Sequence, residues 1–121
     1  MLYEEYRVYY YINRRGKEPV KEYIEKLSKK EQLKVFAYTE LLKDRKGYLD
    51  EPYSKHIKGK IRELRVDFGR KRHRIFYFAF VGKKIILLHA FLKKSTKTPQ
   101  GEIDKAMDNY REVISNQSKY E

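Results

Sequence analysis

The chain has 121 residues, of which 40% are hydrophobic and 15% aromatic, so it can bury one core but is short for two domains. Its formal net charge of +12 attracts polyanions such as nucleic acid, an anionic membrane or an acidic protein. The absence of cysteine excludes disulfide frameworks and thiolate metal sites, and it fits a reducing cytoplasm.

No targeting or membrane segment is visible in the sequence. The N-terminal residues lack a basic segment followed by an apolar run, and no stretch approaches the roughly 18–20 apolar residues of a membrane span. We therefore expect a cytoplasmic protein that does not bind membranes. We expect residues 1–121 to form a single domain, with a polar tail over residues 115–121.

The first half of the chain predicts one strand and two helices. Residues 6–13 are rich in β-forming side chains, and Pro19 begins an apolar helical pattern over residues 19–27. Ser28 and Glu31 have the spacing of a capping box, so a second helix should run from there to about Arg45. The core positions expected on this helix are Leu33, Phe36, Ala37 and Leu41, with Val35, Tyr38 and Leu42 widening the stripe.

The second half predicts three strands and a helix. Residues 47–60 are expected to be loop, and strands are expected over 61–68, 73–80 and 84–91, joined as an antiparallel meander. Thr98 and Pro99 predict the start of the last helix. Its apolar stripe consists of Ile103, Ala106, Met107, Tyr110, Val113 and Ile114.

Together these elements predict an α+β fold. A small antiparallel sheet would contain the N-terminal strand and the three-stranded meander, accompanied by an N-terminal helical hairpin and a C-terminal helix. We expect the helices to cover one face of the sheet and to leave the other open to a ligand.

Several kinds of chemistry find no support in the sequence. His56, His73 and His89 lie far apart and lack the spacing of a metal-binding pair, so we expect no metal and no cofactor. We interpret His89 as a core or edge histidine. For His56, in a basic loop, contact with RNA and simple solvation are both open. No nucleophile elbow, phosphate-binding glycine loop or dinucleotide motif is present.

What remains is a large basic set interleaved with aromatic side chains, a combination typical of single-stranded RNA binding. We expect Arg65 and Arg74 to face outward together rather than to pair with local acids, because an unpaired guanidinium would be costly if buried. Opposite faces, or a buried carboxylate neutralising each arginine, would leave a nuclease without a site. We also expect segments 58–60 and 93–97 to converge on one side of the molecule. The expected RNA-binding residues are Lys55, His56, Lys58, Lys60, Arg62, Arg70, Lys71, Arg72 and Lys97.

Such a cluster is chemically adequate to cleave RNA without a metal. RNA carries its own nucleophile, the 2′-hydroxyl, so an enzyme needs to align it, stabilise charge on the phosphorane and move protons. Arginine can stabilise charge but is a poor base, whereas a lysine whose pKa is lowered by neighbouring cations can act as base or acid.

Three segments, "ELRVDF", "RIFYF" and "LLHAFLKKSTKTP", resemble the RelE/HigB toxins of bacterial type II toxin–antitoxin systems, and within them the phage-derived toxin-like branch. The resemblance spans about residues 6–114. It implies a metal-independent, ribosome-dependent mRNA endonuclease neutralised by an antitoxin, often a helix-turn-helix protein. It also implies catalytic roles for Arg65, Arg74, Lys93 and Lys94.

A second class of function stays open. The chain could be a non-catalytic binding module, either an inhibitor like the related ParE proteins or a degenerate toxin that binds only its antitoxin. Some relatives use a C-terminal tyrosine as acid or base, but Tyr110 fits the apolar stripe of the last helix and is expected in the core.

Overall fold

The computed structural model describes residues 5–121, so residues 1–4, the first part of the expected single domain, lie outside the described region. The fold is α+β, as predicted. Its elements in chain order are β1 (Arg7–Tyr10), α1 (Pro19–Glu25), α2 (Lys29–Asp44), β2 (Ser54–Lys58), β3 (Ile61–Phe68), β4 (Lys71–Phe80), β5 (Lys84–Lys93), α3 (Gln100–Ser115) and a 3-10 turn at Gln117–Tyr120.

The sheet has five strands in the order β1-β5-β4-β3-β2. The meander of β3, β4 and β5 is antiparallel, as expected. β1 pairs with β5 in parallel, from Arg7 opposite Lys84 to Tyr10 opposite Leu87, so the sheet is mixed rather than wholly antiparallel. The parallel pairing is possible because two helices and three strands separate β1 from β5, a connection long enough to cross over and return in the same direction.

β2 lies within the segment expected to be loop. Ser54 pairs with Leu64 and Lys55 with Glu63, which makes β2 an edge strand. Because β2 has charged side chains and a register shift between His56 and Lys58, hydrophobic periodicity does not reveal it. Both features are common on edge strands, where they discourage pairing with another chain.

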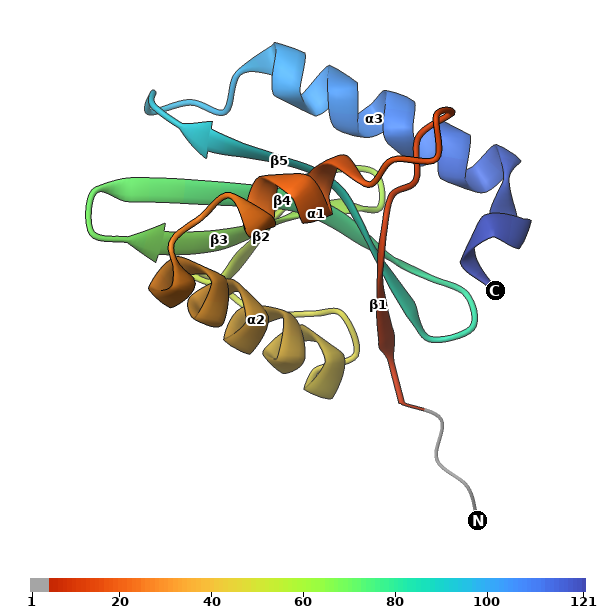
Figure 1. Ribbon diagram of the computed structural model, residues 1–121, viewed down its shortest axis with the longest axis horizontal. Coiled ribbons are helices and arrows are strands. Elements are labelled where there is room, and N and C mark those ends of the chain that lie inside the picture. The colour runs from red at the N-terminus through yellow and green to blue at the C-terminus, as the bar shows by residue number, and fades with distance from the viewer. Residues whose placement is uncertain (1–4) are drawn as a thin grey trace.

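Helices lie on both faces of the sheet, with α1 and α2 on one side and α3 on the other (Figure 1). The expectation of one open face is therefore wrong. The first core lies beneath α1 and α2, and sheet residues such as Leu64, Tyr77 and Leu87 contribute to it. The second core lies beneath α3 and includes Phe76 and Phe78. Strand side chains alternate between these two cores, so a continuous apolar run supplies both.

The capping box that begins α2 is confirmed: the Ser28 hydroxyl accepts a hydrogen bond from the Glu31 N–H, and the Glu31 carboxylate accepts one from the Ser28 N–H. The expected core face of α2 is wrong in part. Leu33 and Phe36 are 68% and 61% exposed. The residues that face the sheet are Glu31, Val35, Thr39 and Leu42.

The end of the chain is more ordered than expected. Pro99 is the N-cap of α3, so the helix begins one residue later than predicted, and Tyr110 packs edge-on against Phe78 as a core residue should. The predicted polar tail instead ends in a 3-10 turn whose Tyr120 is buried. The Tyr120 hydroxyl accepts a hydrogen bond from the Ile12 N–H at 2.9 Å, which ties this turn to the segment after β1.

Candidate functional site

The register of the meander brings the predicted arginines together. Arg65 on β3 lies directly opposite Arg74 on β4, and Arg74 lies opposite Phe91 on β5. Partners across a ladder point to the same face of a sheet, so the prediction that Arg65 and Arg74 share a face is confirmed. Six charged residues on this face form what we call the cationic cluster: Glu63, Arg65, Asp67, Arg72, Arg74 and Lys93.

A buried acid lies at the centre of the cluster. Glu63 has no exposed surface, and its Oε1 lies 3.1 Å from Arg65 Nε and 3.9 Å from Arg74 Nε. The hydroxyl of Thr98, from the loop before α3, donates to Glu63 Oε2 at 3.3 Å. The expectation that the two arginines lack a buried carboxylate partner is therefore wrong. The Glu63 carboxylate holds both guanidinium groups in place, and Asp67 and Glu51 add further negative charge beside them, so the excess positive charge of the cluster comes from Arg72 and Lys93.

Arg74 forms the floor of the cluster. Its side chain is only 6% exposed, its NH1 donates to Asp67 Oδ1 at 2.6 Å, and the same nitrogen donates to the carbonyl of His73. Arg65 lies nearer the surface, with a quarter of its side chain exposed and Glu51 at 4.0 Å from its NH1. An approaching anion would therefore contact Arg65 first, and the positive charge of the buried Arg74 would attract it from beneath.

Lys93 completes the cluster from the end of β5, where it lies opposite Arg72. Partial burial lowers the pKa of Lys93, and although Glu63 opposes the shift, the guanidinium groups of Arg74, Arg65 and Arg72 add to it. A lowered pKa makes the neutral amine more abundant near neutral pH, which is what a lysine needs to take up a proton.

A histidine–acid pair that the sequence did not reveal joins β5, the strand that ends in Lys93, to α3. His89 Nε2 is 3.2 Å from Glu102 Oε1, in the first turn of α3. The imidazole stacks on Phe91, with ring centroids 5.8 Å apart, and also contacts Phe76. The expected core or edge histidine is thus half-buried and partnered. Thirteen residues separate His89 from Glu102, and only the turn into α3 brings them together.

Three further predicted residues share one end of the sheet with the cluster. Arg70 is in the turn between β3 and β4, and Lys94 and Lys97 are exposed after β5. Because Arg72 is level with Lys93, this turn and the segment after β5 lie at the same end. Lys55 is also close, since it pairs with Glu63 across β2 and β3.

The structure does not bring the other predicted residues to this cluster. Arg62 points to the opposite face, where it donates to Ser54 Oγ and the Leu49 carbonyl and lies over the Tyr48 ring. His56 is opposite Arg62 on that same side. Lys71 faces Glu31 of α2, with its Nζ 3.7 Å from Glu31 Oε1.

The expected convergence of segments 58–60 and 93–97 is wrong. Lys58 and Lys60 are at the hairpin that begins β3, whereas Lys93 is level with Asp67 near its end, because Asp67 pairs with Arg72 and Arg72 with Lys93. In an antiparallel meander of three strands, the start of the first strand and the end of the third strand lie at opposite ends of the sheet.

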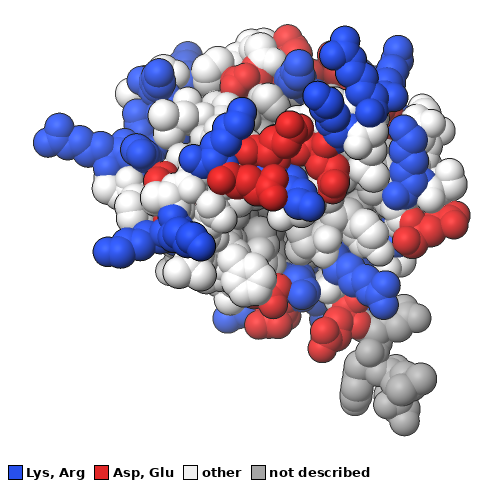
Figure 2. Space-filling model, in the orientation of Figure 1, with Lys and Arg blue, Asp and Glu red and all other residues white. Residues whose placement is uncertain are grey.

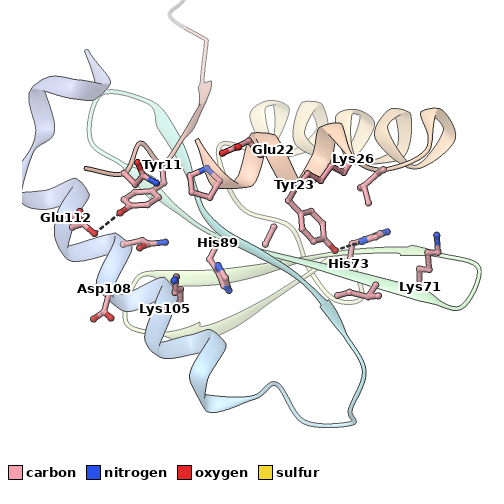
Figure 3. Close-up of a pocket in the computed structure, with 16 residues that line it drawn as sticks. Tyr11, Glu22, Tyr23, Lys26, Lys71, His73, His89, Lys105, Asp108 and Glu112 are labelled. Carbon is pink, nitrogen blue, oxygen red and sulfur yellow. Dashed lines mark hydrogen bonds between the residues drawn. The ribbon is translucent and has the colours of Figure 1, made fainter. Parts of the chain in front are cut away.

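A second ionic set lies on the α1 and α2 side of the sheet. His73 and Glu31 are both buried, and His73 Nε2 is 2.5 Å from Glu31 Oε2. Hydrogen bonds from Ser28 and then from His73 lower the pKa of Glu31 to about 2, so the ionised carboxylate accepts from Nε2–H. The hydroxyl of Tyr23 lies 2.7 Å from Nδ1, which completes a chain from α1 to the sheet (Figure 3).

Beside this set, a groove of about 860 Å³ lies between α1 and α3, with His89 and Leu92 of β5 in its wall. Figure 3 shows Glu112 and Tyr11 at one end and Lys71 at the other. The groove contains three acidic residues, Glu22, Asp108 and Glu112, and Figure 2 shows acidic side chains gathered between α1 and α3 with basic ones around them. It lacks the excess of cations that phosphate binding requires, so the cationic cluster is the better nucleic-acid candidate.

Within residues 5–121, no group of three or more histidine, cysteine, aspartate or glutamate side chains is arranged to hold a metal ion. No helix in the same range has the length and apolar character to cross a bilayer.

The chain is a small α+β domain in which a helical hairpin precedes an antiparallel meander. Arg65 and Arg74 lie opposite each other on β3 and β4. These features define the class of protein. Residues 22–111 match the model of the family described as Phage derived protein Gp49-like (DUF891). The chain belongs to this family, which is toxin-like and of the RelE/HigB type. A search of curated proteins finds no match.

Proposed function

We propose that this protein is the toxin of a type II toxin–antitoxin system and that it cuts mRNA on the ribosome in the cytoplasm, without a metal. The observation that supports this best is the pairing of Arg65 and Arg74 across the meander, with Lys93 at its end. A toxin-like family and a net charge of +12 agree with a polyanionic target.

In the proposed reaction, the 2′-oxygen of RNA attacks the adjacent phosphorus, and the bond to the 5′-oxygen of the next nucleotide breaks. Neutral Lys93 takes the 2′-hydroxyl proton, and the exposed part of Arg65 binds the phosphate as negative charge builds on it. Arg74 adds positive charge from below and fixes Glu63, which in turn orients Arg65. His89 on the same strand is a second group able to carry a proton to the leaving oxygen. Lys94 follows Lys93 in the chain and is exposed, so it can add positive charge near this end of the sheet.

The experiment is controlled expression in a bacterial host, followed by mapping of transcript ends and of their chemistry. Attack by a 2′-hydroxyl leaves a 5′-hydroxyl on the downstream fragment, whereas attack by water leaves a 5′-phosphate. We expect 5′-hydroxyl ends within translated codons, and their loss in Arg74→Ala. Arg111→Ala is the matched control, because Arg111 is exposed on α3 and its ion pair, with Asp108, is exposed as well. Intact transcripts with the unaltered chain would reject the endonuclease.

One observation favours a second candidate, a binding module without catalysis: Glu63 and Asp67 neutralise part of the cluster, and Arg74 is only 6% exposed. Such a module would bind an antitoxin and leave RNA intact. Salt dependence separates the two proposals, because log K for single-stranded RNA falls with log salt by about 0.7 per neutralised phosphate. A flat dependence, together with tight binding of an acidic partner, supports the module.

The proposed partner that neutralises the toxin is an antitoxin, expected to be a helix-turn-helix protein encoded next to this chain. The test is co-expression of the neighbouring reading frame. We expect growth to be restored and the two chains to co-purify. Continued growth arrest with both chains present would rule that frame out as the antitoxin.

A further inference from the structure

The outward face of α2 has apolar side chains that the fold of the chain leaves exposed. Leu33 and Phe36 are 68% and 61% exposed, and Ala37 beside them is exposed as well. These three lie on adjacent helical positions, while Val35 and Leu42 bury the opposite side of the helix against the sheet. An apolar group of this size on a helix otherwise well packed indicates a surface that another molecule covers.

The charges at the two ends of this face have opposite signs. Lys29 and Lys30 are exposed at the beginning of α2, and Asp44 is exposed at its end, while Glu40, one turn before Asp44, is paired with Lys43 at 2.9 Å. Lys30 and Asp44 are each two turns from Ala37, about 10 Å along the helix axis. Basic residues, apolar residues and acidic residues therefore follow one another along a single stripe.

These charges work against the helix that carries them. A helix N-terminus is positive and its C-terminus negative, so lysines in the first turn and an aspartate in the last turn are unfavourable locally. Among residues 5–121, no hydrogen bond or ion pair to the side chain of Lys29, Lys30 or Asp44 is present to offset this. Glu31 in the first turn and Lys43 in the last turn have the favourable signs and offset part of this effect, so Lys30 and Asp44 are the charges at the two ends that a second molecule could pair with.

We propose that α2 pairs antiparallel with α2 of a second copy of this chain, forming a symmetric dimer. A two-fold axis near Ala37 brings the lysine end of each helix to the acidic end of the other, and Leu33 and Phe36 of both copies pack between them. The small side chain of Ala37 allows the helices to approach closely at the crossing. A surface that is complementary to itself in this way is the mark of a two-fold interface.

The dimer leaves the cationic cluster free. α2 covers one face of the sheet and the cluster faces the α3 side, so the proposed RNA face of each copy points away from the partner (Figure 1). The inference is therefore independent of the proposed nuclease and stands or falls separately. The apolar part of the patch has two large side chains per copy, well short of the roughly 20–30 residues a side of a stable interface, so we expect a weak dimer that forms only at high protein concentration.

The experiment is sedimentation equilibrium from about 10 µM to about 1 mM at low salt, on the full chain. Phe36→Ser should weaken dimerisation at least about tenfold. Val81→Ser is the matched control, since Val81 is 73% exposed in the turn between β4 and β5, and it should dimerise as the unaltered chain does. A chain that is monomeric at about 1 mM would overturn the proposal.

A charge exchange separates a second copy from any other occupant. Lys30→Glu or Asp44→Lys alone puts like charges together and should weaken the dimer about three- to tenfold. The combined exchange restores opposite charges and should recover the original constant. Each single variant should also raise the monomer Tm by about 1–4 °C, because each improves the helix dipole, and this shows that weaker dimerisation is not misfolding. Failure of the combined exchange to restore dimerisation would favour a foreign helix as the occupant.

Discussion

The two faces of the sheet each contain a buried glutamate, and the two differ in how many cations surround it. On the α1 and α2 side, Glu31 meets one buried imidazole, His73, and only an exposed ammonium from Lys71. On the α3 side, Glu63 lies between Arg65 and Arg74. The first set is closed and joins a helix to the sheet. In the second set, Arg72 and Lys93 add positive charge that the acids do not neutralise. This is the arrangement expected where an anion binds.

Removal of Glu63 tests the second set most severely. We expect Glu63→Ala to reduce the free energy of unfolding by about 3–4 kcal/mol, because among residues 5–121 it leaves Arg74 buried with Asp67 as its one ion-pair partner. Urea denaturation at pH 7 measures the change. Glu102→Ala is the control, and since Glu102 is 30% exposed in its side chain, a loss below about 1 kcal/mol is expected. Equal losses for both variants would mean that Glu63 is not the anchor of the cluster.

Removal of Glu31 tests the first set. We expect Glu31→Ala to cost about 3 kcal/mol while RNA cleavage by the remaining folded protein is unchanged. The folded-state pKa of Glu31, about 2, lies below its unfolded value, so the stabilisation is complete above about pH 4.5 and is lost as pH falls towards 2. Unfolding curves from pH 7 to pH 2 should show this loss in the unaltered chain and lack it in the variant. A variant with the same acid dependence would contradict the pairing with His73.

The pH dependence of cleavage sharpens the contrast by asking whether the cluster holds a usable proton acceptor. If Lys93 must be neutral, the rate rises tenfold per pH unit below its lowered pKa and levels off above it. Single-turnover cleavage of a ribosome-bound message from pH 6 to pH 10 measures the profile. Lys93→Arg should remove the rise, since arginine stays protonated. An unchanged profile in that variant would direct attention to His89.

The smallest effect expected comes from two neighbours on β4 that point to opposite faces. Arg72 lies opposite Lys93 in the cluster, whereas Lys71 faces Glu31. Arg72→Ala should reduce the slope of log K against log salt for RNA binding by about 0.7, and Lys71→Ala should leave it unchanged. Filter binding at several salt concentrations measures both. Equal changes in the two variants would show that charge alone, and not the face, decides binding.

Local signals in the sequence were sufficient for much of the fold. The β3 strand and the capping box at Ser28 depend on neighbours in the chain, and each is where it was predicted. That Arg65 and Arg74 share a face was also predicted correctly, but their direct pairing is known only from the register of the sheet. Parallel pairing of β1 and the short β2 depend on tertiary position, so alternation and propensity alone did not reveal them.

Most contacts that sequence reasoning missed join residues distant in the chain, although the pairing of Glu63 with Arg65, two residues away, was missed as well. Glu31 and His73 are 42 residues apart, and Thr98 is 35 residues from Glu63. The core face of α2 was mistaken because its exposed stripe is as apolar as its buried one. Helical spacing identifies a stripe but does not say which partner it meets.

The junction of Tyr120 with Ile12 has a consequence for the order of folding. That hydrogen bond spans 108 residues, and the bond from the Tyr11 hydroxyl to Glu112 spans 101. The meander closes through short hairpins, so it can collapse early, while a contact across nearly the whole chain carries the largest loop-closure entropy. We expect these two hydrogen bonds to form in the last step of folding and to break first on heating. They are therefore the natural place to follow the start of unfolding.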